Sequence, residues 1–106
     1  MRTALSSRLK GVSLMPGTGS AVLDFGAAPG TNVVTTTVTG ETGILGTSHV
    51  EAWMMGDSTA DHNAYEHLIV PLVVRVGSIT NGVGFDIVAS SDLRLTGTFA
   101  VHWVWA

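Results

Sequence analysis

The chain has 106 residues, the length of a single domain, and contains no cysteine, which excludes disulfide bridges, thiolate zinc sites and a cysteine nucleophile. Charged residues make up 12% of the sequence, hydrophobic residues make up 45%, and the formal net charge is −3. Because charged residues usually contribute about 25%, a monomer would have few charges to cover its surface. We therefore expect the chain to assemble with copies of itself; a soluble monomer coated with threonine, serine and glycine is the alternative.

Basic residues gather at the start of the sequence. Arg2, Arg8 and Lys10 lie in the first ten residues, whereas all eight acidic residues follow residue 20. We divide the chain into a short N-terminal arm, residues 1–11, and one domain, residues 12–106. The arm is predicted to be either a solvated terminus or an attachment to an acidic neighbour. The acidic domain offers no cationic track for nucleic acid, and no apolar run approaches the roughly 18 residues that cross a membrane.

Glycine and threonine separate short β-branched runs throughout the sequence, which predicts an all-β domain. We expect an antiparallel β-sandwich of six to seven strands. The predicted strands cover residues 21–25, 32–39, 49–55, 68–76, 83–90, 93–95 and 98–105. The fourth continues to residue 80 in a hairpin, because Asn81-Gly82 favours a type I′ turn.

Two polar segments are predicted to lie between these strands. Ser90-Ser91-Asp92 is expected to form a turn. Residues 58–67 are expected to form a loop with at most one short helical turn, which would begin at a capping box of Ser58 and Asp61.

The last strand places Phe99, Val101, Trp103 and Trp105 on one face. Two of the three tryptophans therefore require burial, either in the core of the domain or against a second copy. Pro71 has no backbone N–H to donate to a neighbouring strand, which predicts that the apolar segment around it lies at a sheet edge. We predict a subunit interface formed by Leu68, Val70, Pro71, Trp103 and Trp105.

Polar side chains crowd the segment from Asp61 to His67. Its two histidines are five residues apart, or about 140° on a helix, which excludes the HExxH arrangement of zinc proteases. The side chains could gather an ion, hydrogen-bond one another and the loop backbone, or form a surface for a ligand or partner. The candidate ligand residues are Trp53, Asp61, His62, Tyr65, Glu66 and His67.

Catalytic patterns do not occur in the sequence. It has no nucleophile elbow, no phosphate loop and no pair of acidic residues at a glycosidase spacing. We therefore predict a non-enzymatic protein without a cofactor or metal. Trp53, on the mixed face of its strand, is expected to be partly exposed, where an indole can stack on a sugar ring.

The segment from Leu72 to Ala106 contains a valine-rich strand, the run Ile79-Thr80-Asn81-Gly82-x-Gly84-Phe85-x-Ile87 and the ending Val101-x-Trp103-Val104. This order resembles the closing half of H-type lectin domains. The resemblance implies an antiparallel β-sandwich that assembles as trimers or hexamers, with Gly84, Phe85 and Trp103 in its core. The N-terminal half and the loop 61–67 depart from that family, so no sugar-binding residue is carried over.

A second resemblance covers the whole chain. Its motifs are Leu23-Asp24-Phe25-Gly26, Val50-Glu51-Ala52-Trp53, the Asp61 to His67 cluster, Gly82-x-Gly84-Phe85 and the Trp-Val-Trp ending. Together they resemble small proteins of tailed bacteriophages. The resemblance implies a virion component, either a capsid decoration protein or a tail-associated module, that is assembled in the bacterial cytoplasm and contacts other virion proteins. Together with the lectin resemblance, it leads us to expect a homotrimer. The alternative is a lectin-like module on the phage tail that binds a host glycan.

Overall fold

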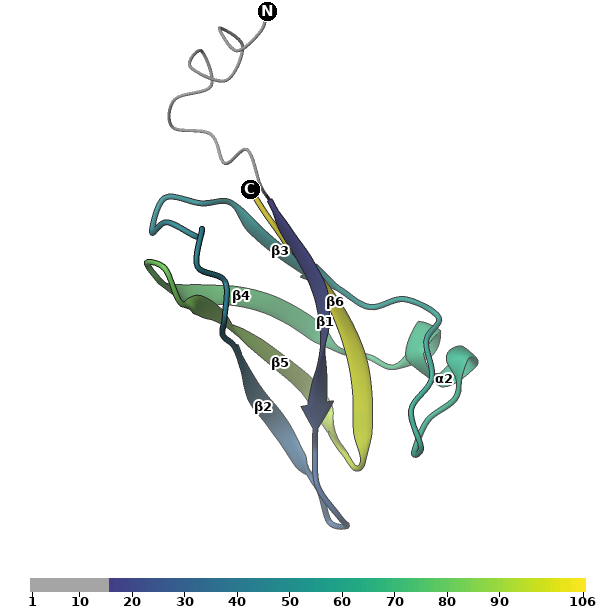
Figure 1. Ribbon diagram of the computed structural model, residues 1–106. Coiled ribbons are helices and arrows are strands. Elements are labelled where there is room, and N and C mark those ends of the chain that lie inside the picture. Colours follow the sequence, from purple (N-terminus) through teal and green to yellow (C-terminus); the bar gives the residue numbers. More distant parts are fainter. Residues whose placement is uncertain (1–15) are drawn as a thin grey trace, which may run out of the picture.

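The computed structural model describes residues 16–106, which form two three-stranded antiparallel sheets and one short helix (Figure 1). The first sheet has the order β1-β6-β3, with β1 Gly17–Asp24, β6 Thr98–Trp105 and β3 Val50–Trp53. The second has the order β2-β5-β4, with β2 Thr31–Val38, β5 Gly84–Leu95 and β4 Val73–Thr80. The helix α2, Ala64–Ile69, precedes β4. The all-β prediction is confirmed, and the predicted arm with Arg2, Arg8 and Lys10 lies outside the described residues.

The core lies between the two sheets because apolar side chains alternate along most of the strands. In β6 every second side chain is buried, from Phe99 to Trp105. The buried apolar residues of both sheets and the adjoining loops form one cluster: Leu23, Phe25, Val38, Ile44, Phe85, Ile87, Ala89, Phe99, Val101, Trp103 and Trp105. The sequence therefore encodes a sandwich core through the two-residue period of its strands.

The C-terminal tryptophans belong to this core. Trp103 is 5% exposed and Trp105 is 3% exposed, because β6 is the central strand of its sheet and both side chains point toward the second sheet. The prediction that these two side chains form a subunit interface is therefore corrected. Burial within the chain itself accounts for the aromatic end of the sequence.

Two glycines of β1 make room for these indoles. Gly17 is paired with Trp105 and Gly19 with Trp103 in the register of the sheet. A β-carbon at either glycine would overlap the indole of the paired tryptophan. The Gly-Thr-Gly run is thus a site of close approach between strands, which is a recognised role of glycine inside a strand.

The segment predicted as a strand over 68–76 is divided between two elements. Helix α2 takes Leu68 and Ile69, and β4 begins only at Val73. Asn63 starts the helix with a capping box, in which its side chain accepts from the N–H of Glu66 and the Glu66 carboxylate accepts from the N–H of Asn63. The predicted capping box at Ser58 was therefore wrong by five residues. Pro71 disfavours the helical conformation for the residue before it, so the helix ends at Ile69.

The predicted turn at Ser90-Ser91-Asp92 is also wrong, because β5 continues through it to Leu95. The register between β2 and β5 shifts between Thr31 and Val33. This β-bulge or similar irregularity accommodates the polar residues within β5. The predicted pairing of β4 with β5 is confirmed, from Val73 opposite Ser90 to Thr80 opposite Gly84. The predicted type I′ turn is wrong, because that turn needs a positive φ at both Asn81 and Gly82, and of the two only Gly82 has one. Gly82 has a φ of 69°, as its turn requires.

Candidate functional site

The polar cluster of residues 59–67 lies against one edge of β6. Strand β3 ends at Trp53, which is paired with His102, so the first residues of β6 have no strand partner on that side. Three side chains take the place of the missing strand. Asp61 Oδ2 accepts from the backbone N–H of Thr98 at 2.8 Å, the Thr59 hydroxyl donates to the Thr98 carbonyl at 2.8 Å, and His67 Nε2 accepts from the N–H of Ala100 at 3.0 Å.

Among the polar and charged residues that the structure describes, only His67 is as buried as the core residues, with 1% exposure. Because its Nε2 accepts a hydrogen bond, its proton lies on Nδ1, which donates to the Asn63 carbonyl at 2.9 Å. The imidazole ring also contacts the edge of Phe99, with 5.2 Å between the ring centroids. His67 therefore joins the first turn of α2 to the central strand of the sheet.

His62 is held in a comparable way. Its Nε2 lies 2.7 Å from the carbonyl oxygen of Thr96 in the turn between β5 and β6. Its ring stacks on Phe99 with 4.0 Å between the centroids and 10° between the planes. Both histidines of the cluster thus pack on one buried phenylalanine, and they contact β6 and the turn before it.

The carboxylate of Asp61 is held in its ionised form. The Thr98 hydroxyl and the Thr98 N–H both donate to it, and these bonds lower the pKa of Asp61 below its usual 3.8. Within residues 16–106, no three histidine, aspartate or glutamate side chains come together in a way that could hold a metal ion. Of the predicted roles for this cluster, these contacts support the one in which its side chains hold the loop in place.

An open hollow of about 540 Å³ lies beside Asp61 and His62, between the turn after β1 and the turn before β6. Asp24 also lines it, but its Oδ1 accepts from the N–H of Gly26, and Asp61 Oδ2 is occupied by Thr98. The acidic groups at this hollow therefore stabilise the two turns.

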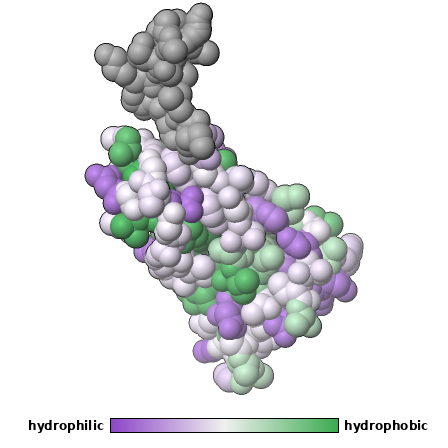
Figure 2. Space-filling view, viewed as in Figure 1, coloured by the Kyte–Doolittle hydropathy of each residue, from purple (hydrophilic) through white to green (hydrophobic). Residues whose placement is uncertain are grey.

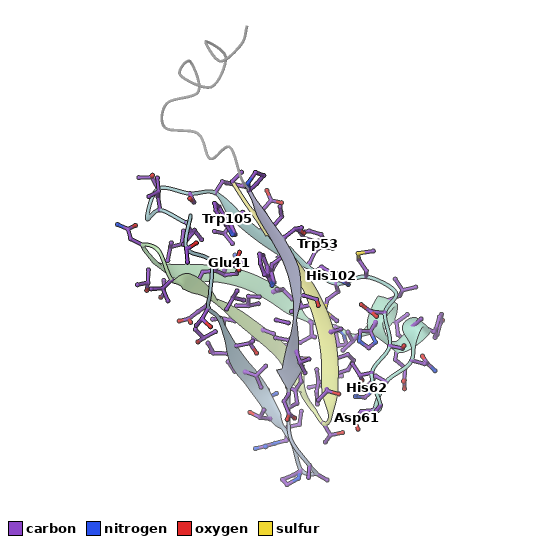
Figure 3. All side chains as sticks on the ribbon, in the orientation of Figure 1. Glu41, Trp53, Asp61, His62, His102 and Trp105 are labelled. Carbon is purple, nitrogen blue, oxygen red and sulfur yellow. The ribbon has the colours of Figure 1, made fainter. Side chains whose placement is uncertain are left out.

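Trp53 lies on the other face of the first sheet, away from the core, and is 39% exposed. The prediction that it is partly exposed is confirmed. Its indole is nearly parallel to the imidazole of His102, with 6.3 Å between the centroids and 25° between the planes. His102 Nε2 lies 2.8 Å from Asp57 Oδ2. We call these three side chains the Trp53 platform; Trp53 and His102 are labelled in Figure 3.

The carboxylate of Asp57 is the electrostatic anchor of the platform. The N–H of Ser58 and then the imidazole of His102 donate hydrogen bonds to it, and both lower its pKa below the usual 3.8. Asp57 is therefore ionised at neutral pH and fixes the orientation of the His102 ring. A fixed ring in turn supports one side of the Trp53 indole.

A second exposed group is apolar and centres on α2. The Leu68 side chain lies beside Gly56, which brings the end of α2 against the segment that follows β3. Of the predicted interface residues, Leu68 and Pro71 are exposed and Val70 is half-buried. The large apolar side chains exposed in these two segments are Met55 at 48%, Tyr65 at 69%, Leu68 at 65% and Ile69 at 59%. We call these four residues the α2 patch.

Figure 2 shows a surface on which most residues have intermediate hydropathy, with hydrophobic groups scattered among a few hydrophilic ones. The colouring agrees with the low charged fraction of the sequence. Exposed apolar side chains also occur on β2, β4 and β5, at Val33, Val73, Val88 and Leu93. Val22, Leu45 and Val83 are exposed as well, so apolar side chains are distributed over several parts of the described surface.

Two side-chain contacts in the structure could not be predicted from the sequence. Strand alternation alone places His102 opposite the aromatic face of β6, but its bond to Asp57 spans 45 positions. Glu41 was not singled out, although its carboxylate accepts from the Trp105 indole N–H at 2.9 Å. The one available signal was the pair of glycines in Gly17-Thr18-Gly19, which indicates that a bulky side chain lies close to the strand.

Within the part of the chain that the structure describes, no helix is long and apolar enough to cross a membrane. Comparisons of the chain with protein-family models, with curated proteins and with solved structures gave no significant match. The resemblances to H-type lectins and to phage proteins accordingly depend on the sequence motifs alone.

Proposed function

We propose that the protein is a non-enzymatic structural module that assembles with copies of itself, as a trimer, on a bacteriophage particle. The observation that carries the proposal is the α2 patch, in which four large apolar side chains are between 48% and 69% exposed. Tyr65, Leu68 and Ile69 share the short helix α2, and Leu68 lies beside Gly56, the residue after Met55. Apolar side chains exposed together in this way are typical of a protein interface. The H-type-lectin-like architecture of the sandwich and the location on the virion are the parts of this proposal that come from sequence motifs.

A second copy of the chain is the occupant that fits the α2 patch best. Tyr65, Leu68 and Ile69 carry no charge, so the patch does not repel its own copy when two protomers meet. The whole chain has few ionic groups, and a symmetric assembly repeats the same contact at each interface. Tyrosine and methionine are also enriched at interfaces, and the patch contains both.

Sedimentation of the full chain at micromolar concentration tests the assembly. We expect a trimer for the natural chain and a monomer for Leu68→Glu, because the new carboxylate would be buried without a partner in each contact. The matched control is Leu93→Glu, which changes an equally exposed leucine on β5 and should leave the trimer intact. A natural chain that sediments as a monomer would overturn the proposal, and dissociation of the Leu93→Glu trimer would overturn the choice of the α2 patch.

The basic arm is the proposed attachment to the particle. We expect a chain without residues 1–11 to keep its oligomeric state and to be lost from purified phage particles, because Arg2, Arg8 and Lys10 supply the cationic group of an otherwise acidic protein. Quantitative mass spectrometry of purified particles measures the retained copies. Equal incorporation of the shortened and natural chains would show that attachment does not need the arm.

A further inference from the structure

A row of side chains crosses the outer face of the first sheet. In the register of the sheet, Ser20 of β1 lies beside His102 of β6, which lies beside Trp53 of β3. The Asp57 carboxylate, from the segment after β3, is bonded to the His102 ring. The labelled Trp53 and His102 lie next to each other along β6 in Figure 3.

Two exposed carboxylates belong to the same region as the exposed indole. Glu51 lies two residues before Trp53 on the same face of β3, and its side chain is 63% exposed. The Asp57 side chain is 38% exposed, and each of its oxygens already has one partner, the N–H of Ser58 for Oδ1 and the His102 ring for Oδ2. The exposed indole therefore shares its face with Glu51 and is linked through His102 to Asp57. Glu51 Oε2 contacts His49, but a carboxylate has about four acceptor positions, so both groups can accept further hydrogen bonds.

We propose that the Trp53 platform is a binding site for a neutral pyranose carbohydrate. The indole offers a flat apolar surface to the C–H face of the sugar ring, and the carboxylates of Glu51 and Asp57 accept hydrogen bonds from its hydroxyl groups. Both acceptors are negatively charged, as is the chain as a whole at −3. A uronic or sialic acid would be repelled, and the site selects uncharged sugars.

The platform is organised before any ligand arrives. Trp53 and His102 are on paired strands, and Asp57 is held by the N–H of Ser58 as well as by His102. A site on strands with locked side chains loses little conformational freedom when a ligand binds. The face bearing the platform is opposite the core, so binding requires no opening of the sandwich.

The residues of this site differ from most of those proposed from the sequence. Trp53 is retained, but both ring nitrogens of His67 and one carboxylate oxygen of Asp61 are bonded to the backbone. These groups hold the loop against β6 and have less capacity for a ligand. Glu51, Asp57 and His102 take their place beside the indole.

Titration of the full chain with simple glycosides tests the site. The probes are the methyl α-pyranosides of glucose, galactose and mannose, with methyl glucuronide as the charged comparison, and the readout is the ¹H–¹⁵N spectrum with its three indole N–H signals. We expect at least one neutral glycoside to bind at millimolar concentration and to move the Trp53 indole signal, with no response to the glucuronide. The absence of a response to all three neutral glycosides would overturn the proposal.

Variants distinguish the platform from the rest of the surface. Trp53→Ala should weaken binding by about tenfold or more, as truncation of a central aromatic anchor does. Trp53→Phe keeps part of the stacking surface and should lose less. Tyr65→Ala is the matched control, since it removes the other exposed aromatic side chain, on α2. Unchanged binding by both Trp53 variants, or equal loss in Tyr65→Ala, would overturn the placement of the site.

The outcome is independent of the proposed assembly. Leu68→Glu alters the α2 patch and leaves Glu51, Trp53 and Asp57 in place, so a monomeric Leu68→Glu chain should still bind the glycoside. Loss of glycoside binding in that variant would show that the site needs a second copy and would overturn a site built from one chain.

Discussion

His67 Nε2 accepts a hydrogen bond from the backbone N–H of Ala100 at 3.0 Å, across 33 positions of sequence. The side chain thereby satisfies a strand edge that no neighbouring strand reaches, because β3 ends at Trp53. A buried backbone N–H without a partner costs free energy, so the fold depends on this ring. The dense polar cluster of the sequence is thus part of the sheet.

Replacement of His67 by phenylalanine tests this role. His67→Phe keeps an aromatic ring but removes the acceptor for Ala100 and the donor for Asn63, and we expect it to lower the free energy of unfolding by about 2–3 kcal/mol. Urea denaturation measures the change. His49→Ala is the control, because that imidazole is exposed and its contact with Glu51 lies at the surface; its effect should be within about 0.5 kcal/mol. Equal effects of the two changes would contradict the role given to His67.

Acid should weaken the fold through Asp61. Hydrogen bonds from Thr98 lower the pKa of Asp61 in the folded chain below its usual 3.8. A lowered pKa contributes stability that is present above pH 3.8 and is lost as the pH falls through the folded value. We expect the free energy of unfolding to decrease as the pH falls below about 4, and Asp61→Asn to flatten this decrease.

Denaturation curves of both chains between pH 6 and pH 2 provide the measurement. Asp57 also has a lowered pKa, with the N–H of Ser58 as its largest cause, so part of the acid sensitivity should remain in Asp61→Asn. If the slope of stability against pH is the same in Asp61→Asn as in the natural chain, Asp61 does not contribute to it.

The close approach of β1 to the tryptophans predicts a cost for added volume. A β-carbon at Gly19 would overlap the Trp103 indole, and we expect Gly19→Ala to destabilise the fold by about 1–3 kcal/mol. Gly77→Ala is the matched control, because no atom lies within 4 Å of a β-carbon at that position in β4. In a double-mutant cycle, Trp103→Leu should remove most of the additional cost of Gly19→Ala. Additive effects would show that the two positions are not in contact.

The bond between Glu41 and Trp105 predicts a different pair of effects. Glu41→Ala leaves a buried indole N–H without its acceptor and should cost about 1–2 kcal/mol, whereas Glu41→Gln keeps an acceptor and should cost less. Thermal unfolding of the two variants gives the comparison. Glu51→Ala, an exposed position of the same residue type, should change the midpoint little. Equal costs for Glu41→Ala and Glu41→Gln would show that the acceptor is not what Glu41 supplies.

Much of the fold could be predicted from local patterns. The hairpin around Asn81-Gly82 and the inward face of β6 follow from two residues and from strict alternation, and both are confirmed, although the turn is not of the predicted type I′. The helix was harder, because Ser58 and Asn63 both precede an acidic residue by three positions. In the structure Asn63 caps α2, whereas the side chains of residues 59 and 61 form hydrogen bonds with the backbone of β6. A tertiary contact thus decided between two similar local signals.

The candidate surfaces were less predictable, for a geometric reason. Trp53 could be assigned to an outer face by alternation, but Asp57 and His102 are separated by 45 positions, and no period relates a loop to a strand. The interface predicted around Trp103 and Trp105 failed because the sequence shows that an aromatic side chain needs burial without showing which surface provides it.

By itself, the sequence determined the all-β class, the two-residue alternation and the hairpin before β5, because these depend on neighbouring residues along one strand. Only the tertiary structure decided that the terminal tryptophans face glycines of β1 and that His67 completes the edge of β6. Such decisions depend on where β3 stops relative to its neighbour, which is a property of the sheet and of the hydrogen bonds it leaves open.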